Sequence, residues 1–347
     1  MIDSYLSDFK EVGADSQALA GWNGPGPFKI VNNYLEGAGE NVISGGADPS
    51  IVNLVPADIE IRRNHFAKPL AWKIGHPEYA GTPWSVKNLF ELKNARRVRI
   101  EGNLFERNWL RAQNGSAILF TPRNQNNTAP WSVVQDVTFR NNIVRHTASG
   151  INILGTDAPN TSRPVQRIEI SNNLFYDISS TNWGGDGRLL QLLTASNAPS
   201  DVLYEHNTGF ATVTPIILSG SAGAPPITYR NNLVGAGAVG IYGNAVGTGL
   251  KAINYYVPGS TFSTNVFVNN IGTEWPPANY PATSLFAASV AAVGFTDAVN
   301  DNYQLTSGSP YHNAATDGKD IGVDVAALAA AMGGSTTPLA PSGLSVR

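Results

Sequence analysis

The sequence predicts an all-β solenoid, in which short parallel strands stack coil upon coil. The first observation behind this prediction is a phrase that recurs eight times: an apolar–polar–apolar triplet, then Asn, then mostly apolar residues. The copies are 25 to 39 residues apart, and repeats of this period indicate a repeat architecture. The Asn residues of the eight copies are Asn33, Asn64, Asn103, Asn142, Asn173, Asn207, Asn232 and Asn265.

Each part of the phrase has a physical reason. The triplet alternates as a strand does, so its apolar residues face one way and its polar residue the other. Asn suits the corner that follows, because its short amide bonds nearby backbone and tolerates unusual dihedral angles. When one copy lies above another, the amides are expected to bond along the axis. The alternative is a run of hairpins, but hairpin turns favour Asn-Gly, and here Asn precedes residues such as Leu104 and Ile143.

The second observation is a set of short apolar runs between the phrases. A variable polar stretch follows each run, so each is predicted to be another strand of the same coil. The runs are residues 17–20, 41–44, 89–92, 117–120, 151–154, 189–192, 216–218 and 240–242. The third observation is that no long helical pattern precedes residues 323–332, which argues against a doubly wound α/β fold.

With these features the chain resembles the right-handed parallel β-helix family, the fold of pectate lyases and of many secreted repeat proteins. The closing segments Asn302–Pro310 and Asp320–Asp324 are similar to the last turns of bacterial members. The resemblance covers residues 1–325 and implies a single-stranded, right-handed coil with loop insertions. It implies no particular reaction, because the family includes lyases, hydrolases, epimerases, adhesins and phage tailspikes, and function depends on the site.

Composition narrows the classes of function. Charged residues make up 14% of the chain, the net charge is −3 and no basic patch stands out, which argues against nucleic-acid binding. No apolar run has the roughly 18 residues that a membrane-spanning helix needs. The absence of Cys excludes thiol chemistry and Cys-based metal sites.

The two ends indicate part of a modular, secreted protein. No signal peptide is present, and Ile2–Leu6 already has a strand pattern, so the coil is expected to be truncated at its N-terminal end. Three segments are expected: a β-helix over 1–325, a short helix and Gly/Ser/Thr/Pro linker over 326–341, and the start of a fibronectin type III-like module over 342–347. The expected location is extracellular or on the cell surface of a bacterium.

Long insertions between strands are the expected sites of function, because loops on a rigid scaffold carry many binding residues. They span residues 69–86, 109–114, 122–133, 157–165 and 179–188. The candidate substrate-binding tryptophans in or beside them are Trp84, Trp109, Trp131 and Trp183. Aromatic faces can stack on sugar rings, but the same rings can also pin a loop onto the coil.

Outward polar residues on the second strands form another candidate surface. If the apolar neighbours of Glu91 point inward, Glu91 points outward, and the same alternation places Asn152 and Gln191 on that face as substrate-binding candidates. Ser44 is expected in the same column. The ionisable residues expected to flank it are Lys87, Lys93, Arg123, Asp186 and Arg188. The alternative is an ordinary solvated face, and a one-residue slip in register would exchange the two faces.

Two kinds of polysaccharide cleavage fit these candidate catalytic residues. A lyase needs a base and a cation that stabilises an enolate, for which Lys93, Arg123 and Arg188 are candidates. A glycoside hydrolase needs two carboxylates, and Glu91 and Asp186 are the best pair. The paired-aspartate motif of polygalacturonases and the Ca²⁺-binding aspartates of pectate lyases are missing, which counts against both classes. No metal ligand is assigned, and a Ca²⁺ requirement stays open.

These observations lead to one expected function and two alternatives. The expected function is a secreted protein that engages an extended polysaccharide or cell-surface glycan, with cleavage by a lyase or hydrolase mechanism left open. The first alternative is a non-catalytic adhesin or stalk. The second is a filament, formed when exposed end coils of different chains stack on one another.

Overall fold

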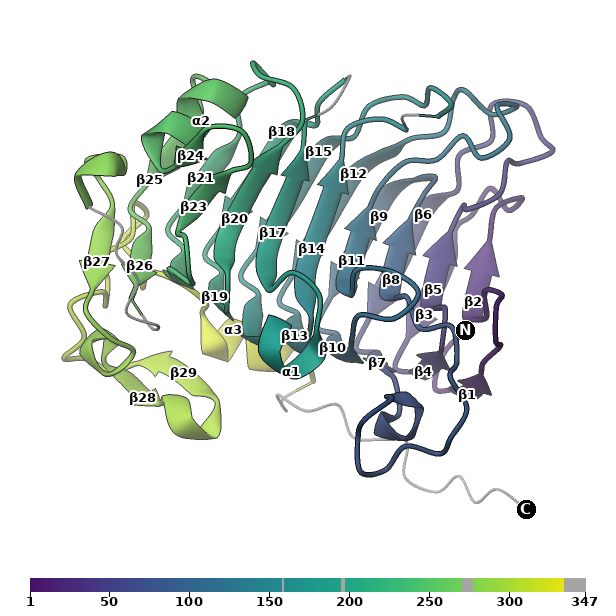
Figure 1. Cartoon of the computed structure of the whole chain (residues 1–347), viewed down its shortest axis with the longest axis horizontal. Helices are drawn as coiled ribbons and strands as arrows, with labels where there is room; N and C mark the ends of the chain where they lie inside the picture. The colour runs from purple at the N-terminus through teal and green to yellow at the C-terminus, as the bar shows by residue number, and fades with distance from the viewer. Residues whose placement is uncertain (158, 195–196, 270–276, 334–347) are drawn as a thin grey trace.

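The computed structural model describes residues 1–157, 159–194, 197–269 and 277–333, and these residues form a β-solenoid with three sheets. We call the sheets A, B and C in the order in which one coil visits them after each variable C–A loop. Strands of the same sheet in successive coils pair in parallel, for example β9 with β12 and β12 with β15. Figure 1 shows sheet C from β2 at the N-terminal end to β23, with its strands side by side.

The strand bounds are as follows. Sheet A contains β3 (Phe28–Val31), β6 (Ala57–Arg62), β9 (Ala95–Glu101), β12 (Val134–Arg140), β15 (Gln166–Ser171), β18 (Ser200–Glu205), β21 (Thr228–Arg230) and β25 (Thr261–Ser263). Sheet B contains β1 (Tyr5–Phe9), β4 (Tyr34–Gly37), β7 (His65–Ala67), β10 (Leu104–Asn108), β13 (Ile143–Thr147), β16 (Leu174–Ile178), β19 (Thr208–Ala211), β22 (Leu233–Gly235), β26 (Val266–Val268) and β27 (Leu285–Ala287). Sheet C contains β2 (Gln17–Gly21), β5 (Glu40–Ser44), β8 (Asn88–Leu92), β11 (Ser116–Phe120), β14 (Ser149–Leu154), β17 (Arg188–Leu193), β20 (Thr214–Ser219), β23 (Ile241–Gly243) and the antiparallel β24 (Gly247–Thr248).

The eight Asn residues of the repeated phrase form one continuous ladder at the corner between sheets A and B. From Asn33 to Asn265, each Nδ2 donates to the Oδ1 of the ladder Asn one coil further on, at 2.8 to 3.2 Å. The predicted axial bonding is therefore confirmed. The unusual dihedral angle, however, belongs to the residue before each ladder Asn, where φ lies between 51° and 66°, as at Arg63 and Gly102.

Apolar side chains of all three sheets fill the interior of the coil. On sheet B, Phe66, Phe105, Val144 and Phe175 follow one another in register along the axis and are fully buried. The rings of Phe66 and Phe105 stack with their centroids 4.3 Å apart. Each coil thus buries its apolar residues against the coils above and below it, as a solenoid requires.

Sheet A carries charges of alternating sign on its outer face. One column along the axis reads Asp58, Arg97, Asp136, Arg167 and Asp201. Arg97 forms a two-bond ion pair with Asp58, at 2.7 and 2.8 Å. Exposed pairs of this kind add little stability each. If a strand of sheet A paired with the strand two coils away, like charges such as Asp58 and Asp136 would meet. The alternation of sign therefore favours the observed pairing of neighbouring coils.

The C-terminal part of the described chain covers the outer face of sheet B. Its elements are η3 (Ala291–Val293), β28 (Phe295–Asp297), η4 (Ala298–Asn300), β29 (Asn302–Leu305) and α3 (Val325–Ala331), whereas η2 (Pro277–Asn279) precedes β27 and leads into Tyr280 of the core. Leu328 of α3 packs with Leu104 and Ile143 of sheet B. Further along the sheet, Leu305 packs with Leu233. Figure 1 shows α3 and the β28–β29 hairpin on the sheet B side of the coil.

Polar residues at the A–B corner fasten this covering segment. Asn172 donates to the carbonyl of Asp324 and accepts its N–H, at 3.2 and 2.6 Å. Asn231 makes the same pair of bonds with Thr316, to its hydroxyl at 2.8 Å and from its N–H at 3.0 Å. Both residues occupy the left-handed position before a ladder Asn. A consecutive Asn pair therefore serves two roles: the second Asn bonds along the ladder, and the first binds the covering segment.

We expect the double substitution Asn172→Gly and Asn231→Gly to loosen residues 316–332 while the coil stays folded. Four hydrogen bonds to the covering segment are lost, each contributing about 1 kcal/mol net, together with the corner contacts of Asn172 with Asn141 and of Asn231 with His206. Gly accepts the left-handed backbone without strain. Hydrogen exchange should accelerate in the covering segment alone. Asn32→Gly is the matched control, because Asn32 has the same conformation but bonds Asp3 in the first coil. Equal exchange in the covering segment of both variants would contradict the assignment.

The remaining elements test the other sequence predictions. All eight predicted second strands are confirmed as strands of sheet C, and the helix predicted over 323–332 is α3. One helix was not predicted: α2 (Leu250–Tyr256), whose Ala252, Ile253 and Tyr256 join the core. Two short elements in loops are η1 (Leu70–Trp72) and α1 (Ser180–Trp183). The predicted linker from residue 334 and the fibronectin-like segment 342–347 lie outside the described residues.

Candidate functional site

The five long insertions all lie beside sheet C. Segments 69–86, 109–114 and 179–188 connect sheet B to sheet C, whereas 122–133 and 157–165 connect sheet C to sheet A. They therefore flank the two edges of sheet C, as Figure 1 shows for the loops above and below its strands. Within the described residues, the A–B corner has no comparable insertion, because only two residues separate most strands there. This arrangement makes sheet C the face on which projecting loops can meet a ligand.

Register places a continuous outward column along the middle of sheet C. It reads Ile43, Glu91, Leu119, Asn152, Gln191, Ile217 and Tyr242. Glu91, Asn152 and Gln191 share this column, as the alternation predicts. The placement of Ser44 is wrong: Ser44 pairs with Leu92, and Ile43 occupies the position beside Glu91. A slip of one residue in the predicted register of β5 accounts for the error.

Several ionisable side chains converge near the N-terminal end of this face. Glu91 is 1% exposed, and its Oε2 lies 3.2 Å from Nζ of Lys93, whereas its Oε1 has no hydrogen-bond partner. Glu40 is also buried, accepts a 2.8 Å hydrogen bond from Gln17, and lies 3.7 Å from Nζ of Lys87. Burial, and secondly the negative charge of Glu91, raise the pKa of Glu40. Two buried carboxyl groups with flanking lysines are a pattern found at functional sites.

A third lysine lies completely inside the fold next to this cluster. Lys68 follows β7, and its Nζ donates to the carbonyls of Gly37, Ala38 and Gly39 and to Oδ1 of Asn41, at 2.5 to 3.2 Å. Burial lowers the pKa of Lys68 to about 7, although the neighbouring glutamates act in the opposite direction. Its burial inside the turn between β4 and β5 gives it a structural role there.

The other candidate catalytic residues form separate ion pairs at the two edges of sheet C. Arg123 lies next to Lys93 at the C–A edge and binds the buried Asp157, with a 2.7 Å distance from its NH1 to Oδ1. Arg188 binds Asp186 at 3.1 Å at the B–C edge.

The structure does not bring Glu91 and Asp186 together. Glu91 lies on β8 and contacts Lys93, whereas Asp186 precedes β17, three strands further along sheet C, and contacts Arg188. A glycosidase needs its two carboxylates about 5 to 9.5 Å apart around one substrate bond. Glu40 and Asp48 do not form a pair either: Glu40 contacts Gln17 and Lys87, whereas Asp48 accepts four hydrogen bonds from residues 125–128 in a C–A loop.

The candidate tryptophans divide between the two edges. Trp109 is 3% exposed and packs with Trp72, while Trp84 and Trp183 are half-buried against the same cluster. This cluster joins the B–C loops to one another. Trp131 lies at the opposite edge, where its Nε1 donates to the carbonyl of Leu54 at 3.0 Å. In this arrangement all four rings order loops, and the half-buried ones keep part of their surface free.

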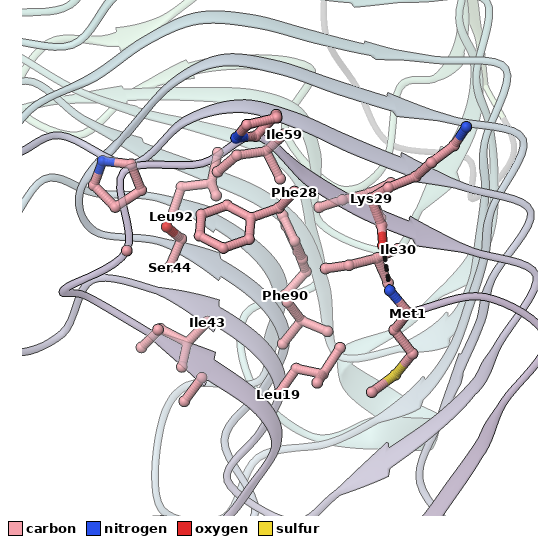
Figure 2. Close-up of a pocket in the computed structure, with 17 residues that line it drawn as sticks. Met1, Leu19, Phe28, Lys29, Ile30, Ile43, Ser44, Ile59, Phe90 and Leu92 are labelled. Carbon is pink, nitrogen blue, oxygen red and sulfur yellow. Dashed lines mark hydrogen bonds between the residues drawn. The ribbon is translucent and has the colours of Figure 1, made fainter.

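A different, apolar cavity opens at the first coil. Figure 2 shows Leu19, Phe28, Ile30 and Phe90 around it, and its volume is about 430 Å³. Met1 lies at its rim, where its amino group donates to the carbonyl of Lys29 at 2.7 Å. Large apolar side chains are exposed at this end, including Ile2, Tyr5, Phe9, Trp22 and Phe28. Apart from Met1 and Lys29, the residues that line the cavity carry no ionisable group.

Searches for a metal site, a membrane span and related proteins give the following results. Within the described ranges, no three His, Asp or Glu side chains are grouped so that they could hold a metal ion. No helix in the part of the chain that the structure describes is long and apolar enough to cross a membrane. No model of a known protein family matches the chain, and a search of curated proteins finds no similar sequence.

Proposed function

We propose that this chain is a right-handed, secreted β-helix protein that binds an extended polysaccharide along the outer face of sheet C. The right hand follows from the strong preference of crossovers between parallel strands. A long face of stacked strands offers repeated contacts to a polymer that has a repeating structure of its own.

One observation carries this proposal: sheet C is the face that combines outward polar residues with loop insertions along both edges. The other two faces are less suited to a ligand. The outer face of sheet B is covered from Leu104 to Val266 by the C-terminal segment. The outer face of sheet A is occupied by ion pairs such as Arg97–Asp58. A bound polymer on sheet C would meet neither obstacle.

The ionisable groups of sheet C support cleavage by hydrolysis more than by elimination. Lys93, Arg123 and Arg188 each contact a carboxylate already, which leaves them poorly suited to stabilise an enolate. Glu40 and Glu91 lie in neighbouring strands, and the raised pKa of Glu40 favours the protonated form that a general acid needs. In this proposal Glu40 donates the proton and Glu91 acts as the base or nucleophile.

A depolymerisation screen tests the proposal. The purified protein is incubated with neutral and acidic polysaccharides, with and without Ca²⁺, and both reducing ends and the ultraviolet absorbance of unsaturated products are followed. Hydrolysis predicts reducing ends without absorbance, and their loss in Glu91→Gln and Glu40→Gln by at least about a hundredfold. Glu60→Gln on sheet A should keep full activity. Absorbance growth would contradict hydrolysis and direct attention to Lys93.

The exposed apolar residues beside the cavity at Phe28 favour a second candidate function, a non-catalytic structural module that associates with other copies. Exposed apolar residues around a cavity that exposes strand edges are typical of association surfaces. Concentration-dependent sedimentation that is abolished by Phe28→Asp, together with no activity on any polysaccharide, would support this candidate. A monomer at all concentrations would exclude it.

A further inference from the structure

We propose that the outer face of sheet C takes an uncharged, hydroxyl-rich glycan, held by hydrogen bonds to Asn152 and Gln191. The inference rests on the proposed function, because it names the class of glycan for the same face. It follows from the two unpaired amides, from the apolar side chains on either side of them, and from the balance of charges around them.

Among the described residues, the adjacent amides of Asn152 and Gln191 have no hydrogen-bond partner. They are register neighbours on β14 and β17 and both are half-buried. Oδ1 of Asn152 is shielded from solvent and accepts no hydrogen bond, and among the described residues neither amide bonds the other. Stacked amides elsewhere in this protein do bond, as Gln166 does to Gln135 on sheet A at 3.0 Å. Unsatisfied polar groups of this kind are rare in proteins, and a ligand that reaches the half-buried parts of both amides would supply partners.

Apolar side chains continue the column on both sides of the amide pair. Leu119 lies beside Asn152 in register and is 7% exposed, and Ile217 lies beside Gln191 and is 3% exposed, so each presents only a small edge to a ligand. A sugar ring presents carbon–hydrogen surface on its faces and hydroxyl groups at its edges. Apolar contacts with a few well-placed polar groups are how proteins bind such small amphipathic units. The amides can both donate to and accept from hydroxyl groups.

Charge balance around the amides disfavours an acidic glycan. Three of the cations beside the column form the pairs Lys93–Glu91, Arg123–Asp157 and Arg188–Asp186, and the fourth, Lys87, contacts Asp15 and Glu40. Each of these cations therefore already has a carboxylate partner. A polyanion would have to break one of these pairs to gain a cation, and it would then meet the released carboxylate. An uncharged glycan needs no such exchange.

Titration calorimetry with the whole protein tests the inference. The probes are uncharged oligosaccharides from xylan, mannan and cellulose, and acidic ones from polygalacturonate and alginate. We expect an uncharged probe to bind with an affinity that changes less than about twofold between low and high salt, because no ion pair with the ligand is formed. The double substitution Asn152→Ala and Gln191→Ala should weaken binding at least about tenfold.

Two controls separate a binding defect from a folding defect. Gln135→Ala with Gln166→Ala removes the bonded amide pair of sheet A and should leave the affinity unchanged. Gln191→Glu keeps the side-chain shape and should still weaken binding, because a carboxylate cannot donate. Salt-sensitive binding of an acidic probe, lost in Lys93→Ala, would overturn this inference while leaving the proposed function intact. Binding of no probe, or binding unchanged by every sheet C variant, would overturn both.

Discussion

The substitution Asn103→Ala is expected to lower the free energy of unfolding by about 4 kcal/mol. Asn103 is fully buried in the middle of the ladder. Its Oδ1 accepts both the backbone N–H and the Nδ2 of Asn64, and its Nδ2 donates to the carbonyl of Ile61 and to Asn142. Alanine leaves these groups without partners inside the coil, and each buried polar group left unsatisfied costs about 1–3 kcal/mol.

Chemical denaturation followed by circular dichroism measures this loss. Asn126→Ala is the matched control, because Asn126 is an exposed loop residue whose side chain makes no hydrogen bond in the described structure. It should change stability by less than about 0.5 kcal/mol. A loss below about 1 kcal/mol for Asn103→Ala would mean that the ladder contributes little to the fold.

The substitution Lys68→Met is expected to cost about 3–5 kcal/mol at neutral pH. Methionine approximates the length of the side chain but donates no hydrogen bond, so three backbone carbonyls and Asn41 lose their donor. Lys29→Met on sheet A is the matched control, because Lys29 is exposed and contacts Glu60 only at 3.6 Å. Equal stability of the two variants would contradict the role assigned to Lys68.

Lys68 also makes stability depend on pH, with a definite sign. Its pKa falls from 10.5 in the unfolded chain to about 7 in the folded protein. Between these values the unfolded chain holds a proton that the folded protein lacks, so the free energy of unfolding rises with pH through this window. Comparison of unfolding curves of wild type and Lys68→Met at pH 7 and 10 isolates the effect. The wild type should gain relative to the variant, and parallel curves would show that the pKa is not displaced.

The stacked strands could be predicted from the sequence because a solenoid repeats its local pattern in every coil. The Asn phrase marks the corner before strands such as β10, and each second run marks a strand of sheet C. The register between coils was harder to predict from the sequence, as Ser44 shows. The strand β5 is short, and a shift of one residue would let its apolar side chains face either side of the sheet. The helix α2 escaped prediction because it has neither the Ala-rich sequence nor the side-chain N-cap of the equally short α3.

The candidate site was only partly visible in the sequence. Alternation along the strands placed Glu91, Asn152 and Gln191 correctly in one column. The partners of the flanking charges could not be predicted, because loops of variable length bring Asp157 to Arg123 and place Asp186 far from Glu91. The cluster around Lys68 and Glu40 gave no local signal, since the turn of the preceding coil supplies the oxygen atoms that Lys68 contacts.

The most direct test of the account is amide hydrogen exchange of the wild-type protein with and without a saturating uncharged oligosaccharide that titration calorimetry has identified as a ligand. The account predicts slower exchange in β11, β14, β17 and β20 and in the loops at both edges of sheet C, with sheet A unchanged. Protection confined to sheet A, or to the open first coil around Phe28, would contradict the claim that sheet C is the binding face.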